Sequence, residues 1–367
     1  MMNNKIKKII IATGGTGGHV FPAYSLAMHF IEKNINVKII SDKRGLRFLK
    51  NSNDLKIIQI NSATIYKKDI VTFFVSSLII SYSIIRSFIF LLFNRPNIVF
   101  GMGGYSSFPV CVAAKILKIP FIIYENNLYI GKANKYLLPY SSRIFVSFLE
   151  LQGVSEKYKY KVCRIGNIIR KEILNFENKT NFKYQDKTLK ILILGGSQAA
   201  KVFAEKLPKI FEKCTTSGMS LKIYQQCLPE QNEILNLLYK NSHIDCEIFN
   251  FTNNILDYFS KVDLAITRSG SSMLAELINT KIPFISIPLP TSADNHQLKN
   301  AIYYEKNQYS YLIEEKNLSE KLFKLLNLIQ KDRSLLEKVK KQQSLYSDKK
   351  VYDNIDKEID KMINEKY

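Results

Sequence analysis

The chain is poor in cysteine, and its few cysteines are widely scattered. Its 367 residues contain five cysteines, and no two of them form a C-x-x-C pair. A disulfide framework is built from an even, closely spaced set, so this usage favours a reducing compartment such as the cytosol. The start of the chain also lacks the basic, apolar and small-residue regions of a secretory signal, so we expect none.

Several short motifs are absent, and each absence argues against a class of site. No run has the G-K-[ST] ending of a P-loop, which disfavours NTP hydrolysis of that type. Zinc-finger spacing and RNP-type aromatic runs are missing, so we expect no nucleic acid as a partner. The Asp-x-Asp element that holds a divalent ion in many nucleotide-sugar enzymes is also absent. We therefore expect neither a metal ion nor a cofactor.

Acidic residues are scarce relative to basic ones. The chain has 53 Lys and Arg against 32 Asp and Glu, which gives a formal net charge of +21 at pH 7. Such an excess attracts negatively charged partners, here an anionic lipid surface or a phosphorylated substrate. Because the basic residues are spread along the chain, a Lys-rich composition without functional meaning also explains part of the excess.

Short branched-apolar runs alternate with helix-like segments, which predicts parallel sheets covered by helices on both faces. The pattern stops at the polar stretch 175–187, which resembles a linker, and then restarts. The length also exceeds that of one typical core, so we expect two doubly wound α/β domains. The predicted strands are Lys5–Ala12, Val37–Ser41, Leu55–Ile60, Asn97–Phe100, Pro120–Tyr124, Ile144–Val146, Leu189–Leu194, Leu221–Gln225, Cys246–Phe249, Leu264–Thr267 and Phe284–Ile287.

Glycine-rich runs follow three of these strands. They are Gly14–Gly18, Gly101–Gly104 and Gly195–Gly196. Glycine lets the backbone approach a ligand closely, and the start of the following helix directs N–H groups at an anion. Because ligands bind outside the carboxyl ends of parallel strands, we expect a phosphorylated ligand at these loops.

His19 follows the first glycine run directly and is a candidate proton acceptor near neutral pH. A nicotinamide dinucleotide stays open as an alternative ligand, because Asp42 ends the second strand where it could bind a ribose. Val20 nevertheless stands where the dinucleotide fingerprint requires its third glycine.

Polar residues of the second domain also cluster after strands. Thr267–Leu277 opens a helix that Ser269 or Ser271 is predicted to cap. Glu276 lies about one and a half turns inside this helix and can accept hydrogen bonds from two ribose hydroxyls, although a solvated surface glutamate is the alternative. The amide of Gln297 suits sugar hydroxyls.

One segment, Ile70–Phe93, is apolar and long enough to span a bilayer. Arg86 lies within it, and a charge in mid-span is costly. We expect a helix that faces partly the core and partly a membrane surface; a wholly buried helix and a true span are the alternatives.

Taken together, these motifs resemble glycosyltransferase family 28, whose members include the enzymes that add N-acetylglucosamine to undecaprenyl-linked muramyl-pentapeptide. The resemblance covers roughly residues 5–340, and its motifs occur in the family's order. The motifs are Gly14–Pro22, Gly101–Tyr105, Glu125–Asn127, Gly166-Asn167 with Arg170, Gly195–Gln198, Arg268–Gly270 with Glu276, and Asp294–Gln297 with Asn300-Ala301.

The resemblance implies a GT-B fold and metal-independent transfer with inversion at the sugar carbon. It implies an acceptor domain over 1–168, a UDP-sugar domain over 169–344, and a C-terminal helix at about 345–367 that packs back on the first domain. The implied partners are UDP-N-acetylglucosamine, an undecaprenyl-linked lipid acceptor and an anionic membrane surface. The implied location is the cytoplasmic face of the bacterial inner membrane, with peripheral attachment.

The resemblance also implies roles for individual residues. His19 corresponds to the proposed general base, while Arg170 and Ser197 correspond to residues that contact the donor diphosphate. Asn127 and Gln297 correspond to sugar contacts, and Thr252 to a uracil contact. The remaining implied ligand contacts are Thr16, Gly17 and Gly18 near the phosphates and Ser271, Ser272, Met273, Leu274, Ala275 and Glu276 near phosphate and ribose.

The sequence departs from the family pattern at several positions. Met273 replaces a usual Thr, Tyr124 a common His, Asn126 a common Gln, and Ile168-Ile169 a usual Pro-Val before Arg170. His19, Glu276 and Gln297 are all present, so we expect an active enzyme. Another nucleotide-sugar transferase, a nicotinamide oxidoreductase and a non-catalytic membrane-bound binding module are the competing functions.

Overall fold

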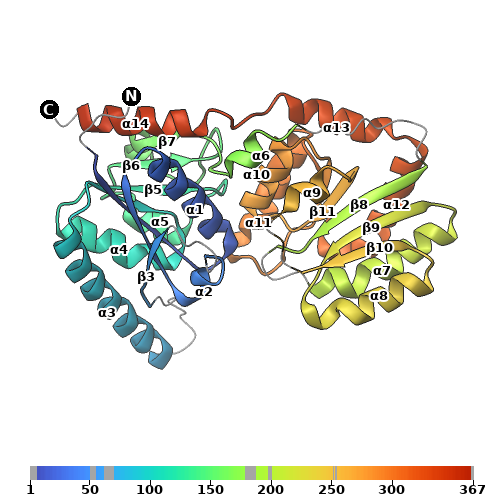
Figure 1. Cartoon of the computed structure of the whole chain (residues 1–367), viewed down its shortest axis with the longest axis horizontal. Helices are drawn as coiled ribbons and strands as arrows, with labels where there is room; N and C mark the ends of the chain where they lie inside the picture. The colour runs from blue at the N-terminus through green and yellow to red at the C-terminus, as the bar shows by residue number, and fades with distance from the viewer. Residues whose placement is uncertain are drawn as a thin grey trace. The chain divides into compact units, whose positions relative to one another are not determined.

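The computed structural model describes residues 6–49, 55–61, 70–177, 187–196, 201–250, 252 and 254–364, and the chain divides into two compact units. Unit 1 comprises residues 1–170 and 348–367, and unit 2 comprises residues 171–347. Figure 1 shows a parallel sheet flanked by helices in each unit.

The sheet of unit 1 has the strand order β3-β2-β1-β4-β5-β6-β7, and every pairing in it is parallel. Its strands are β1 (Lys8–Thr13), β2 (Asn36–Ser41), β3 (Lys56–Gln59), β4 (Ile98–Gly101), β5 (Phe121–Glu125), β6 (Arg143–Val146) and β7 (Val162–Arg164). The helices of this unit are α1 (Gly17–Glu32), α2 (Lys43–Leu46), α3 (Ile70–Asn94), α4 (Gly104–Ile116), α5 (Lys132–Leu137), the 3₁₀ turn η1 (Glu156–Lys161) and α14 (Val351–Asn364).

The sheet of unit 2 repeats this topology, with the order β10-β9-β8-β11-β12-β13 and parallel pairing throughout. Its strands are β8 (Thr188–Leu194), β9 (Ser220–Gln226), β10 (Asp245–Phe249), β11 (Leu264–Thr267), β12 (Phe284–Ser286) and β13 (Tyr311–Leu312). Its helices are α6 (Lys171–Leu174), α7 (Lys201–Thr216), α8 (Asn232–Asn241), α9 (Ile255–Phe259), α10 (Ser271–Asn279), α11 (His296–Lys306), α12 (Leu318–Lys331), α13 (Ser334–Ser344) and the 3₁₀ turns η2 (Pro229–Gln231), η3 (Ala293–Asn295) and η4 (Glu315–Asn317).

The expected fold class, two doubly wound parallel sheets, is confirmed. The pattern missed β7 and β13, which lie at sheet edges and are three and two residues long. Their runs are too short to carry a periodic signal. Most of the polar stretch read as a linker, residues 178–186, lies outside the described residues.

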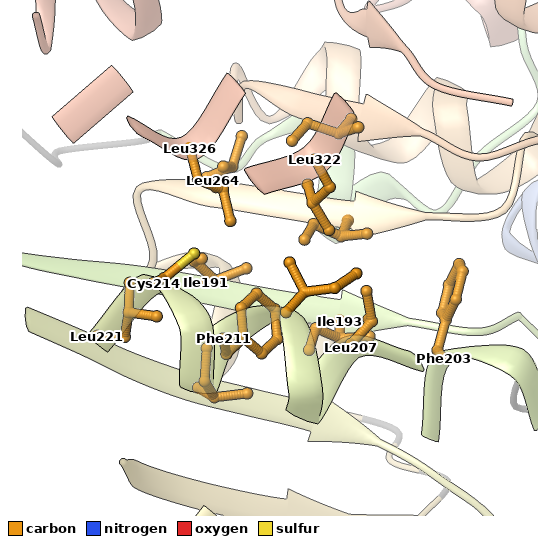
Figure 2. Packing of buried hydrophobic residues seen from close by; sticks show 14 of the residues in the cluster. Ile191, Ile193, Phe203, Leu207, Phe211, Cys214, Leu221, Leu264, Leu322 and Leu326 are labelled. Carbon is orange, nitrogen blue, oxygen red and sulfur yellow. The ribbon is translucent and has the colours of Figure 1, made fainter. Parts of the chain in front are cut away.

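Alternation along the strands builds a core on each face of both sheets. In unit 2, the fully buried Leu189, Ile191 and Ile193 of β8 share one face, where α7 and α12 cover them. Figure 2 shows Leu207 and Phe211 of α7 packed in the same cluster as Leu322 and Leu326 of α12. Because a parallel sheet is buried on both faces, its strands have continuous apolar sequences. These apolar runs are the reason that the strands could be predicted from the sequence.

The C-terminal helix α14 belongs to unit 1, where it packs beside α1. His29 Nε2 lies 2.9 Å from Asp356 Oδ1, and the His29 ring stacks on Tyr352 at 4.6 Å between centroids. Lys33 also donates to Asp356. Although burial acts to raise it, the hydrogen bonds from His29 and Lys33 hold the pKa of Asp356 below its ordinary value.

Helix α3 has an unusual distribution of side chains. Ser83 and Ser87 are fully buried, and α3 lies along α4. Its exposed large apolar residues recur every three or four positions, which places them along one side of the helix. These residues are Phe74, Val75, Leu78, Tyr82, Ile85, Ile89, Leu92 and Phe93. The alternative of a wholly buried helix is therefore wrong.

Candidate active site

The glycine-rich loops lie where the strand order of each sheet reverses. In unit 1, β1 and β4 are neighbours at this switch point, and the first loop (Gly14–Gly18) and the second loop (Gly101–Gly104) follow them. In unit 2, β8 and β11 occupy the equivalent places, and Gly195–Gly196 and the start of α10 follow them. Ligands of doubly wound sheets bind at such points, because the loops on either side diverge there.

Asp42 ties the two loops of unit 1 together. Its Oδ1 accepts hydrogen bonds from the amides of Gly15 at 2.9 Å and Gly45 at 2.8 Å, and its Oδ2 accepts one from Ser106 Oγ at 2.9 Å. Its residue exposure is only 4%. A Cβ on Gly14 would lie 2.5 Å from Ser106 Oγ and 2.7 Å from Asp42 Oδ1, so only glycine fits there.

The ribose role that the nicotinamide alternative gave to Asp42 is therefore wrong. Three protein donors already use both carboxylate oxygens, and the side chain is buried. Periodicity placed Asp42 correctly at the end of β2 but could not distinguish a ligand contact from a contact between loops.

His19 lies in the first turn of α1 against the second glycine loop. Its Nδ1 is 3.0 Å from the carbonyl oxygen of Met102. A carbonyl oxygen only accepts, so Nδ1 carries the proton and the basic lone pair of the neutral ring is on Nε2. The ring is half-buried. Such an arrangement suits proton abstraction from a hydroxyl that approaches Nε2.

The Glu125–Asn127 motif begins at the last residue of β5 and contacts the first loop. Asn126 Nδ2 donates to the carbonyl oxygen of Gly18 at 2.8 Å. The buried Glu125 carboxylate accepts from the amide and side chain of Asn127 and from Asn134 Nδ2, at 2.9–3.1 Å. Asn126, which replaces a common Gln, therefore reaches the first loop directly, and Glu125 orients Asn127.

The segment that leads to Arg170 is anchored within unit 1. Asp348, where the chain returns to this unit, accepts from the amide of Asn167 at 3.0 Å and from Asn167 Nδ2 at 2.9 Å. Ile168 donates its amide to Tyr124 Oη at 3.1 Å. The proline that is usual at position 168 would have no N–H to donate to Tyr124. The hydrogen bond therefore joins two departures from the family pattern, Tyr124 and Ile168. Arg170, at the end of this segment, is half-buried.

The start of α10 differs from the sequence-based expectation. Its N-cap is Gly270, which has no side chain to cap the helix, so the prediction that Ser269 or Ser271 is the N-cap is wrong. Leu274 and Ala275 are fully buried, which leaves their backbone as the part that a ligand could contact. Ser272 and Met273 are half-buried at the first turn. Glu276 is only 7% exposed, so the alternative of a solvated surface glutamate is wrong.

Two other residues expected to contact the ligand in unit 2 accept hydrogen bonds from nearby backbone amides. Thr252 Oγ1 accepts from the amide of Asn254 at 3.0 Å, and Gln297 Oε1 accepts from the amide of Leu289 at 2.9 Å. Arg268 is a structural residue, because its guanidinium donates to the carbonyl oxygen of Ile287 and pairs with Glu315 at 2.6 Å. Ser197 lies outside the described residues.

Metal and thiol chemistry find little support among the described residues. No group of three His, Cys, Asp or Glu side chains in that part of the chain could hold a metal ion. Burial raises the pKa of the thiols, to about 12 for Cys163 and Cys214, which suppresses the reactive thiolate.

Comparison with known proteins identifies the family of this chain. The N-terminal domain model of glycosyltransferase family 28 matches residues 9–146, and the C-terminal domain model matches residues 190–357. A protein of Pelagibacter ubique named UDP-N-acetylglucosamine--N-acetylmuramyl-(pentapeptide) pyrophosphoryl-undecaprenol N-acetylglucosamine transferase is 37% identical over 84% of this chain and 85% of its own length. The chain belongs to glycosyltransferase family 28.

A second relative carries the same name, and a solved structure has the same fold. A Rickettsia canadensis protein of the same name is 34% identical over 84% of this chain and 86% of its own length. The crystal structure of Acinetobacter baumannii MurG, at 24% identity, covers 97% of this chain and 99% of the crystal chain with a TM-score of 0.76. The family 28 fold class, GT-B with two Rossmann-like parallel sheets, is thus the one that this chain adopts.

Proposed function

We propose that this chain transfers N-acetylglucosamine from UDP-N-acetylglucosamine to the muramyl sugar of undecaprenyl-diphosphate-linked pentapeptide. The observation that carries the proposal is the 3.0 Å contact between His19 Nδ1 and the carbonyl oxygen of Met102, which puts the lone pair of the neutral ring on Nε2. Two relatives that are 37% and 34% identical to this chain over 84% of its length carry that transferase name.

In the proposed reaction, Nε2 of His19 takes the proton of the acceptor hydroxyl while that oxygen attacks the anomeric carbon of the donor sugar. The bond between this carbon and the diphosphate oxygen breaks, and its electron pair leaves with UDP. A single displacement of this kind inverts the anomeric carbon. The developing negative charge needs fixed donors, and the α10 N-terminus with its glycine N-cap and Arg170 are proposed to supply them.

The remaining ligand contacts are assigned by the family resemblance and by position at the switch points. Unit 1 is proposed to bind the acceptor, and unit 2 the UDP-sugar. In unit 2, Glu276 would hold the ribose and Gln297 the sugar, with Thr252 beside the uracil and Ser197, Ser271 and Ser272 near the phosphates. In unit 1, Thr16, Gly17 and Gly18 would line the phosphates, and Asn127 would reach the donor sugar.

Ligand-induced stabilisation tests the donor part of this proposal. A ligand present at one hundred times its Kd raises the free energy of unfolding by about 2.7 kcal/mol. UDP-N-acetylglucosamine should therefore raise the melting temperature, whereas NADH should not. Glu276→Gln should lose most of this shift, and Glu320→Gln, at an exposed glutamate paired with Lys324, should retain it. A shift with NADH and none with the UDP-sugar would contradict the proposal.

We also propose that α3 attaches the enzyme peripherally to the cytoplasmic face of the inner membrane. By length and composition, Phe74–Asn94 could cross a membrane, with a mean hydropathy of 1.9, and 17% of its apolar window is buried in the protein. Its buried Ser83 and Ser87, opposite the exposed apolar side chains, favour a helix that lies on the bilayer rather than one that spans it.

Basic residues at the C-terminal end of α3 fit this role. Lys8 and Lys38 donate to the backbone carbonyl and side chain of Asn94 at 2.6 Å. Burial lowers the pKa of Lys38, and the positive charges of Lys8 and Lys56 lower it further. Anionic lipid headgroups would neutralise them, at about 1 kcal/mol for each basic residue at the surface.

Vesicle flotation tests the attachment. The protein should float with vesicles that contain anionic lipid, and replacing Ile85 and Ile89 together by serine should weaken binding. Leu328→Ser, at a comparably exposed leucine of α12, is the matched control and should bind as the parent does. Equal flotation of the double variant and the parent would contradict docking through α3.

A further inference from the structure

The second glycine loop contacts the imidazole of His19 along two of its edges. A Cβ built on Gly103 would lie 3.0 Å from both Cε1 and Nδ1 of the ring. A Cβ on Gly104 would lie 3.3 Å from Cδ2 and 3.7 Å from Nε2. Both glycines also have positive φ angles, +87° and +73°, so the loop has a conformation that other residues rarely adopt.

The same loop supplies the hydrogen-bond acceptor of the ring. Met102 precedes Gly103, and its carbonyl oxygen lies 3.0 Å from His19 Nδ1. Met102 itself is almost fully buried, and its amide donates to the carbonyl oxygen of Ala12 at the end of β1. The acceptor is therefore fixed to the sheet and cannot follow the ring if the ring moves.

From this geometry we propose that the second glycine loop positions His19: it fixes the tautomer through Met102 and the ring plane through Gly103 and Gly104. The inference rests on the proposed role of His19 as the base, and it assigns the loop a task distinct from ligand binding. Gly103 acts through His19, so it is a positioning residue.

The physical reason for the two glycines follows from the ring chemistry. A neutral imidazole with its proton on Nε2 cannot accept a proton at that atom. The Met102 carbonyl excludes this tautomer, because an unprotonated Nδ1 would face an acceptor without a donor between them. An added methyl group at position 103 would push the ring away from Met102 and release the constraint.

Gly103→Ala tests the proposal, and Gly218→Ala is its matched control. Gly218 has almost the same φ angle, +89°, but a Cβ there would meet no atom within 4 Å. The control therefore carries the backbone strain without the contact to an imidazole. We expect Gly103→Ala to lower kcat about 100-fold, because misplacement of a reacting group by about 1 Å costs that much. KM for the UDP-sugar should change less than about twofold, since donor binding is not disturbed. Gly218→Ala should keep both parameters.

Nitrogen NMR of the protein with ¹⁵N-labelled histidine supplies a readout that does not depend on turnover. The protonated and unprotonated ring nitrogens of neutral histidine resonate far apart, and the signals lost in His19→Gln assign the ring. Above the pKa of the ring, the wild type should show the proton on Nδ1, and Gly103→Ala should show it distributed over both nitrogens. The wild-type spectrum decides the question even if Gly103→Ala does not fold.

The possible results distinguish the positioning role of the second glycine loop from the role of His19 as the base. A wild-type ring protonated on Nε2 in an active enzyme, or a folded Gly103→Ala with unchanged kcat and tautomer, would overturn the positioning role. Wild-type turnover in His19→Ala would instead contradict the proposed base, whatever the tautomer of the ring.

Discussion

Replacing Asp42 by alanine should destabilise unit 1 more than any surface substitution. The change removes the acceptor of two backbone amides, those of Gly15 and Gly45, and of the Ser106 hydroxyl. Each buried donor left without an acceptor costs about 1–3 kcal/mol, and the hydroxyl can rotate to another acceptor. The two amides therefore set the cost at about 4 kcal/mol.

For a domain of this size, 1 kcal/mol corresponds to about 2–4 °C in melting temperature, so Asp42→Ala should lower it by about 8–16 °C. Both amides bond to Oδ1, which an asparagine retains, so Asp42→Asn should lose less than half as much. Scanning calorimetry on the intact chain measures the change. Glu156→Ala is the control, because Glu156 is 84% exposed and solvent screens its ion pair with Lys159. An Asp42→Ala protein that melts within about 2 °C of the parent would refute the reasoning.

Three other substitutions or treatments have defined outcomes. Tyr124→Phe removes the acceptor of the Ile168 amide and should cost about 1–3 kcal/mol in denaturant unfolding, with Tyr160→Phe, at an exposed tyrosine, as the neutral control. Because the pKa of Asp356 is lowered on folding, its contribution is present above the unfolded value of about 3.9 and is lost as the pH falls through the folded value. Asp356→Asn should therefore flatten the acid limb of a pH–stability curve, and an unchanged limb would contradict the ion pair. Burial raises the pKa of the Cys111 thiol, so iodoacetamide should modify it in native protein only at the rate of global unfolding, by mass spectrometry.

The sequence predicted the sheets well because their strands are buried on both faces. Runs such as Ile9–Ala12 and Leu189–Leu194 have no competing helical period, and the glycines that follow them mark the strand ends. The pattern did not predict the edge strands Val162–Arg164 and Tyr311–Leu312, because they are short and only half-buried. Strand pairing with a neighbour, rather than local pattern, defines them.

The sequence could propose residues for the candidate site, but it could not predict the contacts between them. Glycine spacing and the family resemblance identified His19 and the second loop separately, whereas their contact joins segments more than eighty residues apart. Asp42 shows the same difficulty, because its partners Gly15 and Ser106 are distant in sequence and its carboxylate read equally well as a ribose ligand. Contacts of this kind depend on strand order, which no local pattern contains.

The departures from the family pattern also became interpretable only in three dimensions. Tyr124 and Ile168 are 44 positions apart, and each looked like an isolated substitution. Their hydrogen bond means that the segment leading to Arg170 is held by a tyrosine hydroxyl in addition to the Asn167–Asp348 contact.

The most direct test of the account is the transfer reaction itself. The purified chain would be incubated with radiolabelled UDP-N-acetylglucosamine, anionic vesicles and undecaprenyl-diphosphate-linked muramyl-pentapeptide, without added metal ions and with EDTA present. We expect one N-acetylglucosamine added per acceptor with a β-anomeric linkage, seen by mass spectrometry and NMR, and loss of this product in His19→Ala. Absence of transfer, a requirement for a divalent ion, or a retained α-linkage would contradict the account.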